Sequence, residues 1–496
     1  MQKTARLFTT GLQLRTIHRS FLKRALSSVS EDQSSISIAD DVVNTFKSVL
    51  GSHNVSSSLA VREHHGKDES YHKCVPPDIV VWPESVDKVC EVVKLCSKYS
   101  IPMVPFGSGT GLEGAATGIR GSVCIDMTKM DKIVEVNPDD FDVTVESGVT
   151  RNMLNSYLRD TGLWFPIDPG ADATVCGMCA TSASGTNAVR YGTMRENVMN
   201  LQVVLANGSV IDTAGKGKRS RKTSAGYNLT NLFVGSEGTL GIITKATIRL
   251  HGIPESMVSA VCTFDTVQSA VDTVTQVMQC GIPVSRIEFL DEVMIDACNK
   301  YNNVDYKIAP TLFLEFQGND KVVDDQAKTV AELVEYNGGS DFTWAKDVDE
   351  RNKLWKARHS AWYSTLALRP GAKGLSTDVC VPISKLPEVI VATKEDLKHS
   401  SVIGPIVGHV GDGNFHVFMN VDPENQDEID EARRLAERMA RRAIAVGGTC
   451  TGEHGIGLGK KQLLIEEIGE TGVATMKQIK ATLDPKGLFN PDKVFL

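Results

Sequence analysis

Four glycines in eight residues mark the run Gly107-Ser-Gly109-Thr-Gly111-Leu-Glu-Gly114, which directly follows the predicted strand Ile101–Phe106. Glycine permits positive φ angles and a close approach of backbone to ligand, and consecutive N–H groups of such a loop can bind a pyrophosphate. Residues 109–114 match the dinucleotide-binding pattern G-x-G-x-x-G, but the Rossmann form requires a helix to start inside it. Because further glycines and a β-rich segment follow here, the run does not indicate a Rossmann domain.

Two further loops share this mixture of glycine and small hydroxyl residues. The first begins at Pro166-Ile-Asp168-Pro169-Gly170, and the whole segment to residue 192 is expected to be loop-like. The second is Gly235-Ser-Glu237-Gly238-Thr-Leu-Gly-Ile-Ile243-Thr. Three such loops in one region predict a binding site for one large anionic cofactor. Ordinary tight turns are the alternative that their spacing leaves open.

The segments around these loops alternate between strand and helix patterns. Upstream, residues 79–82, 85–99 and 101–106 form a predicted strand–helix–strand unit. Downstream, residues 121–149 are expected to be β-rich, and Asn207-Gly208 is expected to join two strands of a hairpin. Beyond residue 255, longer helices are expected at 267–280, 324–337, 347–368 and 427–446, with strands at 311–316, 376–381 and 403–421.

Residues 76–255 resemble the FAD-binding domain of flavoproteins of the vanillyl-alcohol oxidase and p-cresol methylhydroxylase type. The resemblance rests on residues 104–114, 169–192 and 235–244. It implies that the first loop binds the pyrophosphate and the later loops surround the isoalloxazine ring. Relatives with covalent flavin carry a histidine where this chain has Gly109-Thr110-Gly111, so noncovalent FAD is expected. The implied cofactor-binding residues are Pro105, Gly107, Ser108, Gly109, Thr110, Gly111, Pro169, Gly170, Thr174, Gly177, Thr181, Gly185, Glu237, Gly238 and Ile243.

The second half of the chain contains two histidines in Gly408-His409-Val-Gly-Asp412-Gly413-Asn414-Phe-His416. Asp-Gly favours a two-residue hairpin turn, which would place His409 directly opposite His416. Opposed residues of a hairpin share a face, with Cβ atoms about 4.5–5.5 Å apart. Two imidazoles in that arrangement are able to hold one metal ion, and unrelated histidines are the alternative interpretation.

A second motif, Gly452-Glu453-His454-Gly455-Ile-Gly457, follows a predicted long helix. Adjacent residues of an extended chain point to opposite sides, so one of the pair could bind metal while the other meets a substrate. His409, His416 and Glu453 would leave coordination positions open, as catalytic zinc sites do. The ligand types suit zinc or manganese equally, and iron as well. A 2-hydroxy acid could chelate such an ion, with His454 as the base for its hydroxyl proton.

Residues 409–416 and 452–457 match signatures of the D-lactate and D-2-hydroxyglutarate dehydrogenases, and the resemblance covers about residues 60–496. It implies that His409, His416 and Glu453 bind the metal and that His454 is the catalytic base. Arg369 is a second catalytic candidate, because a planar guanidinium suits a substrate carboxylate. Arg358 is a similar candidate, and a purely structural arginine is the alternative for both.

The expected fold class is α+β. A two-subdomain FAD-binding domain of the p-cresol methylhydroxylase type, residues 76–255, precedes an α+β cap or substrate domain with an antiparallel sheet, residues 256–496. Residues 31–75 are interpreted as an N-terminal extension. Residues 1–30 carry six basic residues and no acidic one, which is typical of a mitochondrial presequence. A basic disordered tail is the alternative.

Composition excludes several classes of function. The net charge of −8 argues against a nucleic-acid partner, because phosphate binding needs concentrated Lys and Arg. No apolar run is long enough for a transmembrane segment, although peripheral contact with the inner membrane remains open. Eleven cysteines without framework spacing favour a reducing compartment. The single CxxC at Cys176 and Cys179 is interpreted as two small residues of a loop.

The resemblance implies an FAD-dependent D-lactate dehydrogenase that passes electrons to cytochrome c. The same chemistry on another D-2-hydroxy acid, 2-hydroxyglutarate or glycolate, is an alternative, and a five-carbon diacid would need an extra cation in the pocket. An oxidase that returns electrons to oxygen is another. A binding protein without turnover is disfavoured, because a base beside a three-ligand site serves no purpose in it. The electron acceptor, the metal and the oligomeric state are not determined by the sequence.

Overall fold

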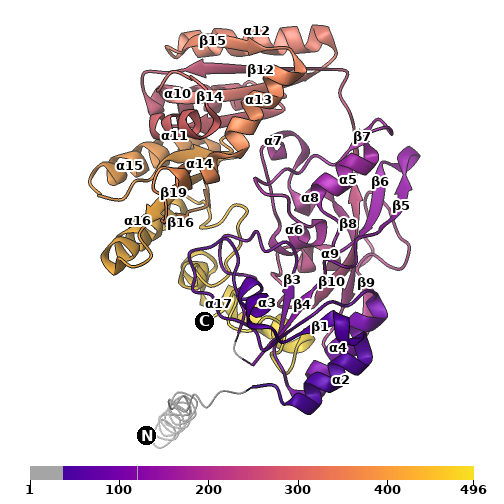
Figure 1. The fold of residues 1–496 in the computed structure, drawn as a ribbon. Helices are drawn as coiled ribbons and strands as arrows, with labels where there is room; N and C mark the ends of the chain where they lie inside the picture. Colours follow the sequence, from indigo (N-terminus) through magenta and orange to yellow (C-terminus); the bar gives the residue numbers. More distant parts are fainter. Residues whose placement is uncertain (1–36, 120) are drawn as a thin grey trace, which may run out of the picture. The chain divides into compact units, whose positions relative to one another are not determined.

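The computed structural model describes residues 37–119 and 121–496, and residues 38–496 form one compact unit (Figure 1). The presequence expected at residues 1–30 lies outside the described residues. Because a single unit spans the rest of the chain, the domain boundary at residue 255 stays a prediction. Within residues 37–119 and 121–496, no helix has both the length and the apolar character needed to cross a bilayer.

A four-stranded sheet carries the first glycine loop. Its order is β1 (Val55–Ser56), β2 (Ile79–Val81), β4 (Val123–Asp126) and β3 (Met103–Phe106). Strands β2, β4 and β3 are parallel, and α4 (Val86–Tyr99) connects β2 to β3 as predicted. Helix α4 begins where the Ser85 hydroxyl accepts the Lys88 N–H, and its valines are buried with α2 (Asp40–Leu50) in one core. The loop at residues 107–114 therefore leaves the carboxyl end of a parallel strand.

A five-stranded antiparallel sheet carries the other two loops. Its order is β5 (Ile133–Asn137), β6 (Asp142–Glu146), β10 (Ile242–Arg249), β8 (Val198–Val204) and β9 (Val210–Asp212). The predicted hairpin is confirmed, since Val204 pairs with Val210 and Gly208 adopts a φ of +76° in the turn. The helices of this region are α5 (Arg151–Leu158), α6 (Val175–Thr181), α7 (Ala188–Tyr191), α8 (Met194–Asn197) and α9 (Leu229–Phe233).

The expectation of an irregular loop throughout residues 166–192 is wrong, because α6 and α7 lie within it. Helix α6 forms because its Val175, Cys176, Met178 and Cys179 side chains are buried in the core against the five-stranded sheet. Burial raises the pKa of both thiols, so Cys176 and Cys179 stay protonated and pack as apolar side chains.

The second half of the chain forms an antiparallel sheet covered by helices, as expected of the cap (Figure 1). The sheet order is β15 (Ser340–Ala345), β12 (Ser256–Thr263), β14 (Thr311–Gly318), β13 (Arg286–Leu290), β18 (Ile406–Gly408), β19 (Asn414–Val421) and β16 (Lys373–Ser376), with β17 (Val379–Cys380) also on β19. The helices are α10 (Val267–Gln279), α11 (Glu292–Asn302), α12 (Asp320–Tyr336), α13 (Val348–His359), α14 (Ala361–Ala367), α15 (Leu386–Lys398), α16 (Gln426–Ala445) and α17 (Lys461–Leu483). The helix expected at 347–368 is broken at Ser360.

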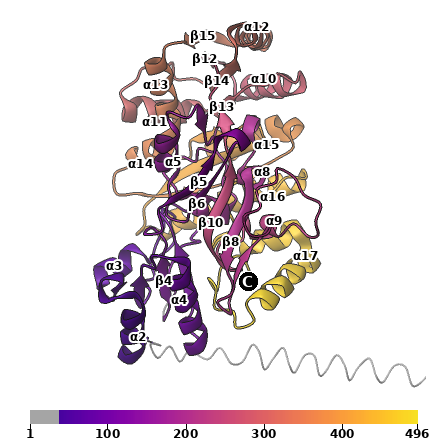
Figure 2. The ribbon, with the colours of Figure 1, turned by 90° about the vertical axis from the view of Figure 1, so that its right-hand side faces the viewer.

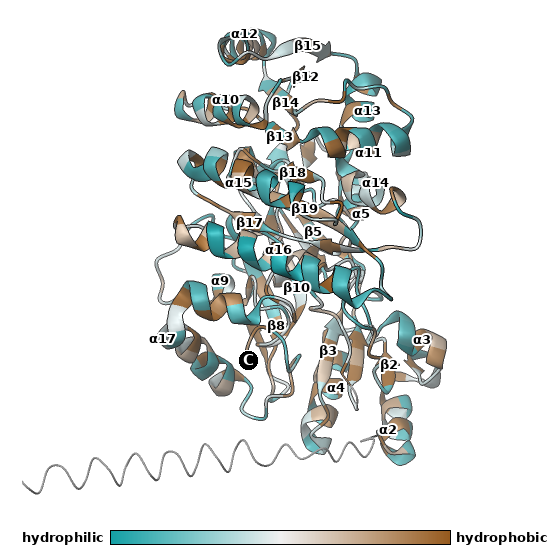
Figure 3. Ribbon diagram, turned by 90° about the vertical axis from the view of Figure 1, so that its left-hand side faces the viewer, coloured by the Kyte–Doolittle hydropathy of each residue, from teal (hydrophilic) through white to brown (hydrophobic). Residues whose placement is uncertain are grey.

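Helix α16 is amphipathic, with mainly hydrophilic residues on the side turned outward in Figure 3 and Leu435, Met439 and Ala443 buried. After α17 the chain returns to the first sheet (Figure 2). Met103 N donates to Leu488 O and Asn490 N donates to Met103 O, each at 2.7 Å. Phe489 is fully buried in the core of the four-stranded sheet. The C-terminal residues therefore belong to the core of the N-terminal sheet.

Candidate active site

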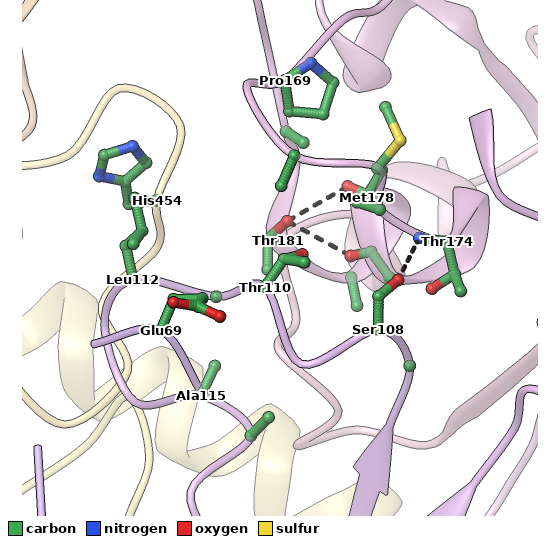
Figure 4. Close-up of a pocket in the computed structure, with 18 of the residues that line it drawn as sticks. Glu69, Ser108, Thr110, Leu112, Ala115, Pro169, Thr174, Met178, Thr181 and His454 are labelled. Atoms are coloured by element: carbon green, nitrogen blue, oxygen red, sulfur yellow. Dashed lines mark hydrogen bonds between the residues drawn. The ribbon is translucent and has the colours of Figure 1, made fainter. Parts of the chain in front are cut away.

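One large cavity is lined by all three glycine loops and by residues of the second half of the chain. Figure 4 shows Ser108 and Thr110 of the first loop, Pro169, Thr174 and Thr181 of the second, and His454 at the far side. Every expected cofactor-binding residue lines this cavity except Gly185. A Cβ atom at Gly185 would lie 2.6 Å from the Asp168 backbone carbon, so this glycine supports the second loop instead of facing the cavity.

The first two loops are tied together where they line the cavity. Ser108 Oγ accepts the Thr174 N–H at 2.9 Å, and a Cβ at Gly107 would lie 2.5 Å from Thr174 Oγ1 (Figure 4). In the third loop Gly238 has a φ of +70°, and a Cβ there would lie 3.0 Å from Pro105. A side chain at either position would crowd these neighbouring side chains, so glycine allows the loops to pack this closely. A cavity lined by three glycine-rich loops fits the phosphates of a dinucleotide cofactor such as FAD.

His409 and His416 meet at one carboxylate. Nε2 of His409 and Nε2 of His416 each lie 3.1 Å from Oε1 of Glu453. The ring centroids of the two histidines are 5.5 Å apart. These three residues are buried or nearly so and line the cavity, and their ligand atoms lie within 4.8 Å of one another. The structure thus brings together the three residues predicted to bind a metal.

The predicted register of this hairpin is wrong. Val407, not His409, pairs with His416, and residues 409–413 form a wider turn than the expected Asp412-Gly413. The wider turn arises because Asn414 N and Asp412 N both donate to His409 O, while Gly413 packs against the Val381 carbonyl. The shift is two residues, an even number, so His409 and His416 still share a face of the sheet.

The hydrogen bonds of the two rings define their tautomers. His409 Nδ1 lies 2.8 Å from Glu288 Oε1, and His416 Nδ1 lies 3.1 Å from the Thr377 carbonyl oxygen. Both partners are acceptors, so both Nδ1 atoms must carry a proton. The Glu453 carboxylate, which is another acceptor, faces both Nε2 atoms. Burial disfavours a charged ring, but the Glu288 and Glu453 carboxylates outweigh it and raise the pKa of His409 well above its usual value, so a proton or a metal ion at this point satisfies the acceptors. Metal-binding histidines usually donate their other ring N–H to a carboxylate or carbonyl in this way.

A second set of three possible ligands, Asp378, His416 and His454, overlaps the first. Asp378 Oδ2 already accepts the Glu453 N–H and the His454 N–H, at 2.9 and 2.8 Å. Its Oδ1 accepts the Asn414 side-chain amide at 2.7 Å. Because donors already surround this carboxylate, the Glu453 set fits a metal ion better.

His454 lies against the metal-binding set without belonging to it. Its ring is stacked on His416, with centroids 4.9 Å apart and planes inclined by 13°. Burial lowers the pKa of His454 to about 4, so the ring is neutral at physiological pH. Its Nδ1 is buried and has no hydrogen-bond partner among the described residues. A neutral imidazole lining the cavity has the properties of a general base.

The two candidate arginines differ in position. Arg369 does not line the cavity: its side chain is 41% exposed and pairs with Glu428 and Asp422, so the prediction of a substrate clamp there is wrong. Arg358 does line the cavity and is buried, with its Nη2 2.6 Å from Glu288 Oε2. Since Glu288 in turn holds His409, Arg358 anchors one end of the histidine set.

Sequence reasoning missed Glu288, Asp378, Glu113 and Lys460. Glu288 lies inside a strand, and Glu113 ends the first glycine loop, where its carboxylate pairs with buried Lys460 at 2.6 Å. None of these residues has a local motif that distinguishes it from a surface charge. Only their burial in the folded chain identifies them.

Comparisons with known proteins show the family of this chain. Residues 77–214 match the family "FAD binding domain", and residues 253–494 match "FAD linked oxidases, C-terminal domain". A probable mitochondrial D-lactate dehydrogenase of Danio rerio is 62% identical over 91% of each chain. The mitochondrial D-lactate dehydrogenase [cytochrome] of Arabidopsis thaliana is 44% identical over 92% of this chain and 80% of that one. The predicted mitochondrial location is thereby confirmed, and the presequence itself stays a prediction.

Solved structures support the fold. p-Cresol methylhydroxylase with substrate bound has a TM-score of 0.76 at 19% identity, covering 92% of this chain and 96% of that one. The 4-ethylphenol oxidase of Gulosibacter chungangensis gives 0.77 at 18% identity, with the same coverage. The expected two-part flavin fold followed by an α+β cap is therefore confirmed, as is an FAD-binding domain.

Proposed function

Because this chain belongs to the FAD-linked oxidase family, and within it to the mitochondrial D-lactate dehydrogenases, we propose that it oxidises D-lactate to pyruvate with FAD and a divalent metal ion and passes the electrons to cytochrome c. The observation that carries the proposal is the meeting of three acceptor atoms, from His409, His416 and Glu453, beside a neutral His454 in the cavity of the glycine loops.

His409, His416 and Glu453 would hold the metal, with zinc or manganese as the candidates that suit their donor atoms. The three glycine loops would hold FAD without a covalent bond, because Gly109-Thr110-Gly111 has no histidine for attachment. When both are bound, the metal lowers the pKa of the substrate hydroxyl and FAD accepts the hydride.

The side chains of the protein perform the remaining tasks. Arg358 faces the cavity with a planar guanidinium, which suits a carboxylate, and replaces Arg369 in that role. His454 accepts the hydroxyl proton, since burial keeps its ring neutral. The stacking of His454 on His416 keeps this base beside the residues that would hold the metal. Apolar walls such as Leu112, Trp362 and Phe418 limit the access of water.

The cavity favours a monocarboxylic 2-hydroxy acid over a diacid. Among the described residues that line it, Arg358 is the one arginine or lysine, and Glu69 adds a negative charge. The second carboxylate of 2-hydroxyglutarate would lack a cation. Glycolate as substrate and oxygen as electron acceptor are the alternative functions. An acidic protein, with net charge −8, would attract a basic carrier such as cytochrome c.

The test is anaerobic reduction of the bound flavin by D-lactate, with L-lactate as the control. We expect D-lactate alone to bleach the visible flavin bands, and reoxidation to be faster with cytochrome c than with oxygen. A flavin spectrum that D-lactate leaves unchanged would contradict the substrate assignment. Faster reoxidation by oxygen would favour an oxidase.

A further inference from the structure

The loop that carries Glu453 and His454 is held by two buried carboxylates on its backbone. Asp378 accepts the N–H groups of Glu453 and His454 through one oxygen, at 2.9 and 2.8 Å. Glu237 accepts the N–H groups of Ile456 and Gly457, one on each oxygen, both at 2.8 Å. Four backbone donors within residues 453–457 are thus bound by side chains from far away in the sequence.

Glu237 comes from the third glycine loop, on the FAD-binding side of the cavity. Its backbone φ is +50°, an unusual value for a residue with a side chain, and the residue is buried. The loop packs so closely on Glu237 that a Cβ at Gly455 would lie 2.9 Å from the carboxyl carbon. Both oxygens of Glu237 are therefore occupied by the 456–457 backbone, although the residue was expected to contact the cofactor.

We propose that Glu237 is a positioning residue that holds the 453–457 loop, and with it Glu453 and His454, against the flavin-binding loops. A carboxylate is required because each oxygen faces an N–H donor, and an amide would direct its own NH2 group at one of them. Buried carboxylates with two backbone donors form strong, charge-assisted hydrogen bonds. Glu237 thus joins the loop that lines the flavin cavity to the loop that binds the metal.

A neighbouring contact supports the same function. Leu458 N donates to Glu113 O at 2.8 Å, and the Glu113 carboxylate pairs with Lys460. The loop is therefore attached to the first glycine loop as well as to the third. Asp378 holds the backbone of Glu453 and His454 directly, and Glu237 holds the backbone two to three residues further along. A shift of the Glu237 contact would therefore be transmitted through this short loop to both residues.

The test is Glu237→Gln in the flavin-containing protein. This inference rests on the proposed function, and two measurements separate them. The first is Zn²⁺ binding to chelator-treated protein, measured by competition titration. The second is hydrogen–deuterium exchange of the peptide at residues 450–460. Zn²⁺ is a suitable probe even for a manganese site, because it generally binds such ligands more tightly. We expect faster exchange in that peptide and roughly 10-fold to 100-fold weaker Zn²⁺ binding, as for other residues that orient metal ligands.

The flavin spectrum should be unchanged in this variant, and excess Zn²⁺ should restore much of the D-lactate-dependent flavin reduction. A general loss of stability would not produce this dependence on metal concentration. Asp142→Asn is the matched control, because Asp142 is equally buried but pairs with Arg219 and Asn137, outside the loop. It should leave Zn²⁺ affinity and the exchange of residues 450–460 unchanged.

Unchanged exchange and Zn²⁺ affinity within twofold of wild type would overturn the positioning role. If Glu237→Gln does not fold, Glu237→Asp keeps the charge and withdraws the carboxylate by one methylene, and the same two measurements apply to it. If the wild-type protein binds no Zn²⁺ and D-lactate does not reduce its flavin, the proposed function fails. The exchange measurement then decides on the positioning of the loop by itself.

Discussion

The imidazole rings of His416 and His454 are stacked, with their centroids 4.9 Å apart and their planes inclined by 13°. One ring has its Nδ1 held by a carbonyl and its Nε2 at the Glu453 carboxylate, whereas the other has a buried Nδ1 without a partner among the described residues. The two neighbouring rings therefore differ: both nitrogens of His416 face acceptors, whereas burial keeps the His454 ring neutral, with a free lone pair that can accept a proton.

His454→Asn should remove the base while leaving the metal-binding set in place. The backbone N–H at this position bonds to Asp378 and does not depend on the side chain. We expect the rate of flavin reduction by D-lactate to fall by about 10²-fold to 10⁴-fold, the usual contribution of a general base. Anaerobic stopped-flow spectroscopy measures it. Unaltered flavin content and Zn²⁺ affinity would show that the site is intact, whereas a near-normal rate would exclude His454 as the base.

Removal of divalent metal should abolish flavin reduction by D-lactate without releasing the flavin. The glycine loops and the His409–His416–Glu453 set line different parts of one cavity, so loss of the ion should leave the visible spectrum in place. We expect EDTA treatment to stop the reduction and added Zn²⁺ or Mn²⁺ to restore it. Full activity in protein shown by elemental analysis to be metal-free would contradict metal assistance.

Arg358→Lys and Arg369→Lys form a matched pair. A lysine at position 358 lacks the planar guanidinium with which Arg358 lines the cavity and binds Glu288. We therefore expect kcat/KM for D-lactate to fall at least about 10-fold. At position 369 the side chain is half exposed, so kcat/KM should stay within about twofold of wild type, since exposed ion pairs contribute little. Steady-state kinetics compares the two variants. A larger loss of kcat/KM in Arg369→Lys than in Arg358→Lys would support the prediction that Arg369 binds the substrate carboxylate.

Phe489→Ala should destabilise the FAD-binding half although residue 489 lies at the end of the chain. Phe489 is fully buried in the core of the four-stranded sheet, and truncation of a buried phenylalanine costs about 3–5 kcal/mol. We expect a lower midpoint of thermal unfolding and earlier flavin release on heating. Leu496→Ala is the control. Leu496 is 62% exposed, so this variant should unfold at the same temperature as the wild-type protein. Equal midpoints for both variants would show that the tail is dispensable.

Local sequence was sufficient for most helices and strands and for most of the residues that meet in the cavity, with Gly185 and Arg369 as exceptions. The strand–helix–strand unit before Gly107 was predictable because hydrophobic periodicity and the Ser85 cap are local signals. The Asn207-Gly208 hairpin was predictable because that dipeptide accepts the φ angles of its turn. Helix α6 was not, since its glycine and small residues resemble a loop until the core buries one side of it.

The three proposed metal ligands and the proposed base were recognisable as candidates from their motifs, because histidine and glutamate side chains can bind a metal ion or accept a proton. Their geometry was not recognisable, because the register of β18 and β19 depends on contacts of the turn with Val381, far from it in sequence. Arg369 and Arg358 could not be ranked from sequence either, because exposure and distance to a cavity are properties of the folded chain.

The sequence alone determined which chemical groups this protein has: three glycine loops for an anionic cofactor, two histidines and a glutamate for a cation, and a histidine for a proton. Only the tertiary structure decided how those groups are oriented, because Glu288, Asp378 and Glu237 act through hydrogen bonds between residues that are far apart in the chain. A buried carboxylate has no local pattern, since burial and the donors around it exist only after the two halves of the chain pack together.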